Sequence, residues 1–288
     1  MIFVLYLVMG ALAGTLSGLL GVGGGIIVVP GLILLFQYSH IFTDALIMHM
    51  AVGTSLAIMI FTTLSSAGAY YRRGFIIWPI FLRFIPGLCV GMIVGAMITK
   101  QLSSQLLITL FGIFLLVIAL FLLFSKSDQE TRHRNSRSNK IILDKNKLTF
   151  FFAIPRQLLK ELLFVAAALL IGVCSTVFGI GGGLLMVPFF LYVGLTVRES
   201  SGTSSVCGIP IACIGTLILT LTGWSVTKNM TTPFGTLGFI YWPAAGMVSV
   251  TSILFAPIGT RLAVKLHPKT LKRILAGLLI INAINLLK

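Results

Sequence analysis

Long apolar runs separated by short polar breaks make up most of the chain. Ten runs can be distinguished, five on each side of a polar stretch at 125–160. They cover 1–20, 26–36, 45–70, 75–98 and 102–124, then 162–178, 184–193, 200–221, 239–262 and 271–287. About 20 residues of helix cross a bilayer core, so most runs predict membrane-spanning helices. The runs 26–36 and 184–193 are about half that length at ~1.5 Å per residue and predict half-helices.

The two halves share sequence landmarks as well as the same order of runs. SGLLGVGGG at 17–25 returns as STVFGIGGG at 175–183, and each is followed by Val-Pro. Gly-Thr-Ser at 53–55 returns at 202–204, and GFIIWP at 74–79 returns as GFIYWP at 238–243. Three landmarks in the same order indicate an internal repeat.

Lys and Arg set the expected topology. If all ten runs cross or turn back, 17 of the 21 basic residues face the cytoplasm. A rival plan, in which each half-helix fuses with the preceding run, separates the charges less well. The first plan predicts an all-α polytopic membrane protein of two inverted repeats, each with four long hydrophobic segments plus one short half-helix after a Gly-rich break. Its parts are repeat 1–124, a basic cytoplasmic linker 125–160 and repeat 161–288.

Composition supports a multi-pass membrane protein. Hydrophobic residues make up 57% and charged residues 9%, against about 25% charged in soluble proteins. The net charge of +15 would suggest nucleic acid in a soluble protein, but here it reports topology, so the expected partner is the bilayer and not nucleic acid. The four cysteines and four histidines are scattered, which predicts neither a metal site nor a cofactor.

The two glycine clusters are the first candidate substrate site. Consecutive glycines break a helix, and non-helical backbone at membrane depth must be buried in protein or line a water-filled space. The helix N-terminus after each break can bind an anion without a cationic side chain. We expect the two breaks to approach each other; the alternative is that the glycines only permit close helix packing. The candidates are Gly21, Gly23, Gly24 and Gly25, with Gly179, Gly181, Gly182 and Gly183.

Two repeated hydroxyl pairs are the second candidate. Thr54 with Ser55, and Thr203 with Ser204, each follow a glycine in the next long run. Their hydroxyls can donate to anion oxygens. The alternative is a hydroxyl bonding to a carbonyl one turn earlier in its own helix.

Arg83 is the third candidate, because it lies deep inside an apolar run. It can bind the anion, pair with a carboxylate, or extend to the membrane surface. Asp44 and Glu199 lie at helix starts, where acidic groups are ordinary stabilisers, and no carboxylate is expected mid-membrane. Coupling through His49, or through no side chain, stays open.

Other repeated positions have structural explanations. Glycines spaced four apart, at 10, 14 and 18 and at 87, 91 and 95, predict close helix packing. Trp78 and Trp242, each followed by proline, are interpreted as interface anchors beside a kink.

The doubled Gly-x-Gly-Gly-Gly…Val-Pro and Gly-Thr-Ser motifs resemble the sulfite exporter TauE/SafE family over essentially the whole chain. The resemblance implies an inner-membrane carrier of sulfur-containing inorganic or organic anions, such as sulfite, sulfoacetate and other sulfonates. By that resemblance, the glycine clusters and the two Thr-Ser pairs match the family's signature positions. It implies no role for the basic central segment.

We therefore expect a secondary transporter, not an enzyme, that moves small sulfur anions by alternating access. Transporters of an uncharged solute or another anion are the alternative. An intramembrane serine enzyme is disfavoured because His49 and Ser55, six residues apart, do not share a helical face. No ATP-binding motif appears, so a gradient must supply the energy. A homodimer is compatible with such a carrier, but no residue argues for one.

Overall fold

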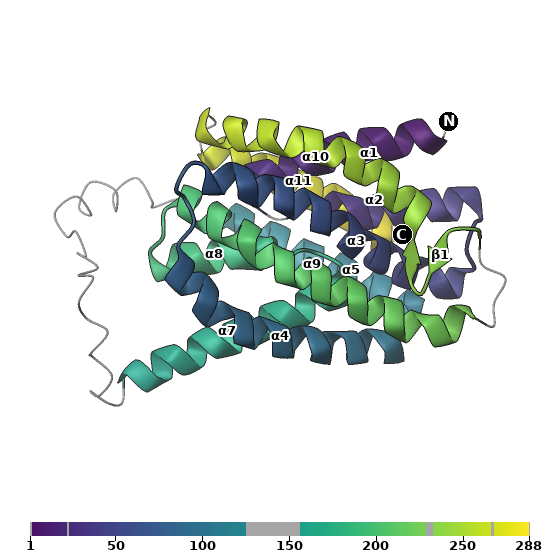
Figure 1. Cartoon of the computed structure of the whole chain (residues 1–288), viewed down its shortest axis with the longest axis horizontal. Coiled ribbons are helices and arrows are strands. Elements are labelled where there is room, and N and C mark those ends of the chain that lie inside the picture. Colours follow the sequence, from purple (N-terminus) through teal and green to yellow (C-terminus); the bar gives the residue numbers. More distant parts are fainter. Residues whose placement is uncertain (1, 22, 125–155, 229–232, 266–267, 288) are drawn as a thin grey trace.

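The chain folds into a bundle of helices with one very short hairpin (Figure 1). The computed structural model describes residues 2–21, 23–124, 156–228, 233–265 and 268–287. The first half contains α1 (Ile2–Leu20), α2 (Gly25–Ser39), α3 (Asp44–Tyr71), α4 (Trp78–Gln101) and α5 (Ser104–Phe124). The second contains α7 (Arg156–Phe178), α8 (Gly183–Val193), α9 (Val197–Thr227), β1 (Thr236–Leu237), β2 (Ile240–Tyr241), α10 (Trp242–Lys265) and α11 (Pro268–Leu287).

The described helices have the lengths expected of a membrane protein. Five of them, α3, α4, α7, α9 and α10, are long and apolar enough to cross a bilayer. The half-helices α2 and α8 have 15 and 11 residues, or about 22 Å and 16 Å at ~1.5 Å per residue. The expected polytopic helical architecture is thereby confirmed.

Each long helix packs mainly against a helix of the other half. α1 lies along α10, α4 along α7, and α5 along α11, while α3 packs against α9 (Figure 1). A Cβ built on Gly14 would lie 2.7 Å from the Cα of Ser252 in α10, and one on Gly95 would lie 3.0 Å from the Cα of Val173 in α7. These distances are too short for real side chains, so the two glycine stripes provide close packing, as expected.

We expect Gly91→Leu to destabilise the protein by at least the ~1–3 kcal/mol typical of overpacking. A side chain there would collide with the carbonyl oxygen of Leu169 and would crowd the Cα of Gly172 at 3.1 Å. Thermal unfolding in detergent checks this. Gly246→Leu is the control, because Gly246 lies on α10 with nothing within 4 Å of a built Cβ. Equal melting temperatures for both variants would contradict the packing account.

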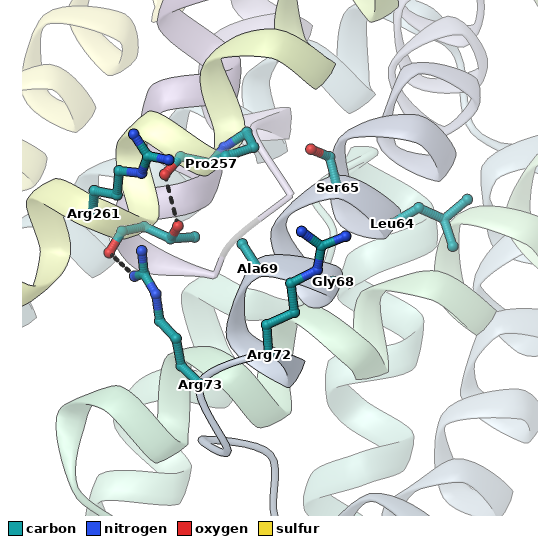
Figure 2. A pocket seen from close by; sticks show the side chains of 9 residues that line it. Leu64, Ser65, Gly68, Ala69, Arg72, Arg73, Pro257 and Arg261 are labelled. Atoms are coloured by element: carbon teal, nitrogen blue, oxygen red, sulfur yellow. Dashed lines mark hydrogen bonds between the residues drawn. The ribbon is translucent and has the colours of Figure 1, made fainter.

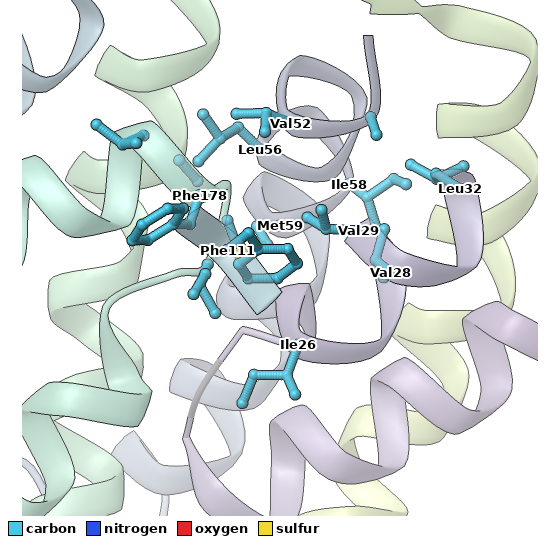
Figure 3. Packing of buried hydrophobic residues seen from close by; sticks show 14 of the residues in the cluster. Ile26, Val28, Val29, Leu32, Val52, Leu56, Ile58, Met59, Phe111 and Phe178 are labelled. Atoms are coloured by element: carbon cyan, nitrogen blue, oxygen red, sulfur yellow. The ribbon is translucent and has the colours of Figure 1, made fainter. Parts of the chain in front are cut away.

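The apolar core surrounds α3, which packs against both α2 and α5 (Figure 3). Val29 and Leu32 of α2, Ile58 of α3 and Phe111 of α5 are all fully buried. The ring of Phe111 stacks on Phe178 with 5.5 Å between centroids. Phe178 is the last residue of α7, so this core fixes the point at which the second glycine break begins.

Several boundaries differ from the sequence-based expectation. α2 runs over Gly25–Ser39 instead of 26–36, and α7 begins at Arg156, inside the expected linker. The rest of that linker, 125–155, lies outside the described residues. The β1–β2 hairpin was not expected.

The expected kinks at the two Trp-Pro pairs are wrong. Trp78 and Trp242 are the first residues of α4 and α10, so Pro79 and Pro243 occupy the first turn. A proline there removes no helical hydrogen bond, because the first N–H groups of a helix have no intrahelical acceptor. These prolines start their helices rather than bend them.

Candidate functional site

Both glycine clusters interrupt the helical backbone. Between α1 and α2, Gly21, Gly23 and Gly24 have φ values of 68°, 76° and 80°, and between α7 and α8, Gly179 and Gly182 both have φ of 65°. This left-handed region favours glycine over residues with a Cβ. The predicted helix breaks are therefore present in both halves, and the described residues of both breaks are buried.

The two breaks lie against each other. A Cβ built on Gly25 would collide with the carbonyl oxygen of Gly179 and would lie 2.9 Å from the Cα of Ile180. One built on Gly23 would lie 3.5 Å from the Cα of Gly181. The breaks, more than 150 residues apart in sequence, thus touch through backbone atoms, which confirms that they approach each other.

The half-helices α2 and α8 begin at this contact. Gly24 and Gly182 are their N-cap residues, and neither cap is made by a side chain. The carbonyl of Gly24 accepts from the N–H groups of Ile27 and Val28. The first N–H groups of a helix have no intrahelical acceptor, and the helix dipole places partial positive charge there. Two such N-termini lie in one buried region, and helix N-termini of this kind can bind anions.

The serines of the hydroxyl pairs bind the breaks directly. Ser55 Oγ donates to the carbonyl oxygen of Gly179 at 2.9 Å. Ser204 Oγ donates to the carbonyl oxygen of Gly21, also at 2.9 Å, and to that of Ser201 at 3.1 Å. Both serines are fully buried. Each serine therefore holds the break of the opposite half, a role that neither sequence-based alternative described. The bond from Ser204 to Ser201 is in addition the bond to the preceding turn of its own helix that the second alternative expected.

The threonines of the same pairs bind the backbone just before α10 and α4, in each case in the opposite half. Thr54 Oγ1 accepts from the backbone N–H of Tyr241 at 3.0 Å, and Thr203 Oγ1 accepts from that of Ile77 at 3.1 Å. Both threonines are fully buried. Their contacts again join one half to the other, and neither is a bond to a carbonyl of its own helix.

Met59 lies between the two breaks and was missed by sequence reasoning. Its Sδ accepts a hydrogen bond from the N–H of Gly181 at 3.0 Å, and a Cβ on Gly23 would lie 2.9 Å from the same sulfur. Met59 is fully buried on α3. No sequence signal identifies it, because a methionine in an apolar helix is ordinary. A thioether is only a weak acceptor, so the N–H of Gly181 has a weak partner here.

Arg83 is not brought to the breaks. Its Nη1 lies 3.7 Å from Oε1 of Glu161 on α7, and the two side chains are 69% and 60% exposed. This contact matches the carboxylate alternative among the three left open by the sequence. An exposed pair of this kind adds little stability.

His49 is buried near the start of α3 and takes no part in the breaks. Its Nε2 lies 3.0 Å from the carbonyl oxygen of Thr99, and its ring packs on Phe239 with 5.2 Å between centroids. Ser55, six residues later, bonds to Gly179 instead. Among the described residues no group of three or more His, Cys, Asp or Glu is placed to hold a metal.

Known proteins resemble the chain over most of its length. The model of the family described as sulfite exporter TauE/SafE matches residues 6–286. A "Probable membrane transporter protein" of Haemophilus influenzae is 30% identical over 98% of this chain and 97% of its own. YunE of Bacillus subtilis, also named a probable membrane transporter, is 32% identical over 68% of this chain and 69% of its own.

A third relative, the probable membrane transporter MJ0441 of Methanocaldococcus jannaschii, is 26% identical over 96% of this chain and 91% of its own. No solved structure matches. The names of these relatives are those of transporters, not enzymes. The family match spans nearly the whole sequence and includes both glycine breaks and both hydroxyl pairs. The chain is a multi-pass membrane protein that belongs to the TauE/SafE family of membrane transporters.

Proposed function

We propose that this protein is a secondary transporter of small sulfur-containing anions, such as sulfite, sulfoacetate or other organosulfonates. The observation that carries the proposal is the contact between the two breaks, where α2 and α8 both begin without a side-chain cap. The anion binds to backbone N–H groups at these N-termini. Ser55 and Ser204 position the breaks, and Arg83 has no part in binding.

We further propose that the halves are inverted repeats. A Cβ on Gly208 would lie 2.8 Å from Thr63, and one on Gly215 would lie 3.0 Å from Leu56. The residue number on α9 increases from 208 to 215 while that of its contact on α3 decreases from 63 to 56. These equivalent helices are therefore antiparallel. The paired serine and threonine bonds also recur in both halves. Rocking one half against the other around the breaks gives alternating access.

In this proposal the sulfur of Met59 takes the place of an anion oxygen between transport events. Its sulfur accepts from the N–H of Gly181, and an anion oxygen is a much stronger acceptor for the same group. The incoming anion therefore displaces the thioether. This exchange leaves the N–H of Gly181 paired when the substrate leaves.

Met59→Leu is expected to tighten anion binding. Leucine has a similar volume but no acceptor, so the anion no longer competes with sulfur for Gly181. A hydrogen bond contributes about 0.5–1.5 kcal/mol, which corresponds to a dissociation constant about threefold to tenfold lower. Isothermal titration with the transported anion measures it. Met50→Leu, at a fully buried methionine of the same helix, is the control. Unchanged or weaker binding in Met59→Leu would argue against the displacement.

Transport by the purified protein in proteoliposomes tests the proposed function. Labelled sulfite, sulfoacetate and taurine are supplied with an imposed ion or proton gradient, and sucrose serves as an uncharged solute. Gradient-dependent movement of a sulfur anion, but not of sucrose, is the expected result. Movement of sucrose with no anion transport would overturn the proposal.

A further inference from the structure

A cavity of about 400 Å³ lies away from the glycine breaks, at the C-terminal ends of α3 and α10 (Figure 2). Arg72 and Arg73, which follow α3, and Arg261 of α10 line it, together with Leu64 and Thr260. The charge pattern predicts that this end faces the cytoplasm. Three guanidinium groups, two from the segment after α3 and one from α10, therefore line one pocket.

The positive charge of this pocket has no acidic partner within the described part of the chain. Glu161 pairs with Arg83, Glu199 forms the capping box of α9, and Asp44 lies at the opposite end of α3. Gathering like charges without a counter-charge is unfavourable. An anionic ligand would relieve this repulsion.

One of the three arginines has a structural role. Arg73 Nη1 donates to the carbonyl oxygen of Thr260 at 2.6 Å and thereby ties the loop after α3 to α10 (Figure 2). Arg72 and Arg261 are both exposed. Arginine presents several donors in a planar arrangement that suits phosphate, so these two residues are the ones available to a ligand.

The surface beside the pocket is apolar. On α3, Phe61 and Leu64 are 40% and 50% exposed, and on α10, Leu254 and Ile258 are 64% and 44% exposed. The two residues of each pair are three or four positions apart, so they share one face of their helix. That face continues towards Arg72, just after α3, and towards Arg261 on α10. Each helix thus carries an exposed apolar stripe ending in positive charge. A free inorganic anion gains nothing from contact with an apolar surface, whereas the acyl chains of a lipid pack against it.

We propose that this pocket binds the phosphate head group of an anionic phospholipid, with the acyl chains along the apolar stripes of α3 and α10. Basic pockets between membrane helices on the cytoplasmic side are suited to such head groups. Arg261 is not shared by the two halves: α4 and α10 both have 24 residues, and at their shared spacing Met97 replaces it.

The test compares lipid binding by the full chain and by two charge-matched double variants in detergent. Arg72→Gln with Arg261→Gln alters the pocket but leaves Arg73 on Thr260. Arg83→Gln with Lys100→Gln removes the same charge from α4, away from the pocket. Native mass spectrometry and thermal shift are recorded with phosphatidylglycerol and with zwitterionic phosphatidylcholine.

We expect phosphatidylglycerol to bind and to raise the melting temperature more than phosphatidylcholine does. Its affinity should fall tenfold or more in the pocket variant and stay within twofold in the control. Equal affinity in both variants would overturn the site.

A competition arm on the unaltered protein separates lipid from free anion and does not depend on the variants folding. Inorganic phosphate is added at millimolar concentration to the phosphatidylglycerol complex. Retention of the lipid is expected, because the acyl chains contribute to binding. Displacement of the lipid, together with a thermal shift by phosphate alone, would show a soluble-anion site and overturn the lipid proposal.

Discussion

The double variant Gly24→Val with Gly182→Val is expected to lose anion binding and transport by about 100-fold or more. Both glycines have positive φ and cap the half-helices, and a β-branched residue resists this conformation. The adjoining peptide planes then rotate, which displaces the first N–H groups of α2 and α8. Loss of two hydrogen bonds to a charged ligand, about 1.5–3 kcal/mol each, gives this factor.

A matched control separates this effect from general backbone strain. Gly74 and Gly194 also have positive φ, one in each half, and nothing lies within 4 Å of a Cβ built on either. Gly74→Val with Gly194→Val imposes comparable strain away from the breaks. Transport in proteoliposomes should survive in this control and fail in the break variant. A well-folded break variant with full transport would rule out the proposed site.

Ser55→Ala with Ser204→Ala is expected to lower both stability and transport. Each change removes the donor to a break carbonyl in the opposite half. A buried polar group left unpaired costs about 1–3 kcal/mol, so the pair costs roughly 2–6 kcal/mol. This corresponds to a fall in melting temperature of roughly 5–20 °C, measured by thermal unfolding in detergent.

The control for the serine variant removes hydroxyls that do not join the halves. Ser39 Oγ donates to the carbonyl oxygen of Leu35, and Thr222 Oγ1 donates to that of Ile218, each within its own helix. Ser39→Ala with Thr222→Ala should change the melting temperature little, because those carbonyls lie within helices whose backbone ladder also supplies donors. A drop as large as that of the serine variant would mean that the bonds between halves have no special role.

The sequence was sufficient to predict the two breaks and their contact. Consecutive glycines are poor helix formers, and repetition of the motif linked Gly21–Gly25 to Gly179–Gly183. The close packing of Gly14 and Gly95 was also predictable, because a regular spacing of small residues has one main use in membrane helices. These features depend on local backbone chemistry, which the residue type largely decides.

The orientation of individual side chains was not predictable in the same way. Lipid is about as apolar as the protein interior, so hydrophobic periodicity does not mark which face of a helix is buried. Arg83 therefore could not be assigned to the outer surface, where it meets Glu161. For the same reason Met59 could not be distinguished from other apolar residues of α3, although it contacts both breaks.

The central claim is that the two breaks bind a sulfur anion, and thermal titration of the purified protein tests it most directly. Sulfite, sulfate, sulfoacetate and chloride are titrated, with sucrose as the neutral solute. A ligand that binds only the folded state raises the melting temperature with concentration. The account predicts such a rise for a sulfur anion in the unaltered protein and in Gly74→Val with Gly194→Val, but not in Gly24→Val with Gly182→Val. An equal rise in all three proteins, or a rise with sucrose and none with any anion, would contradict it.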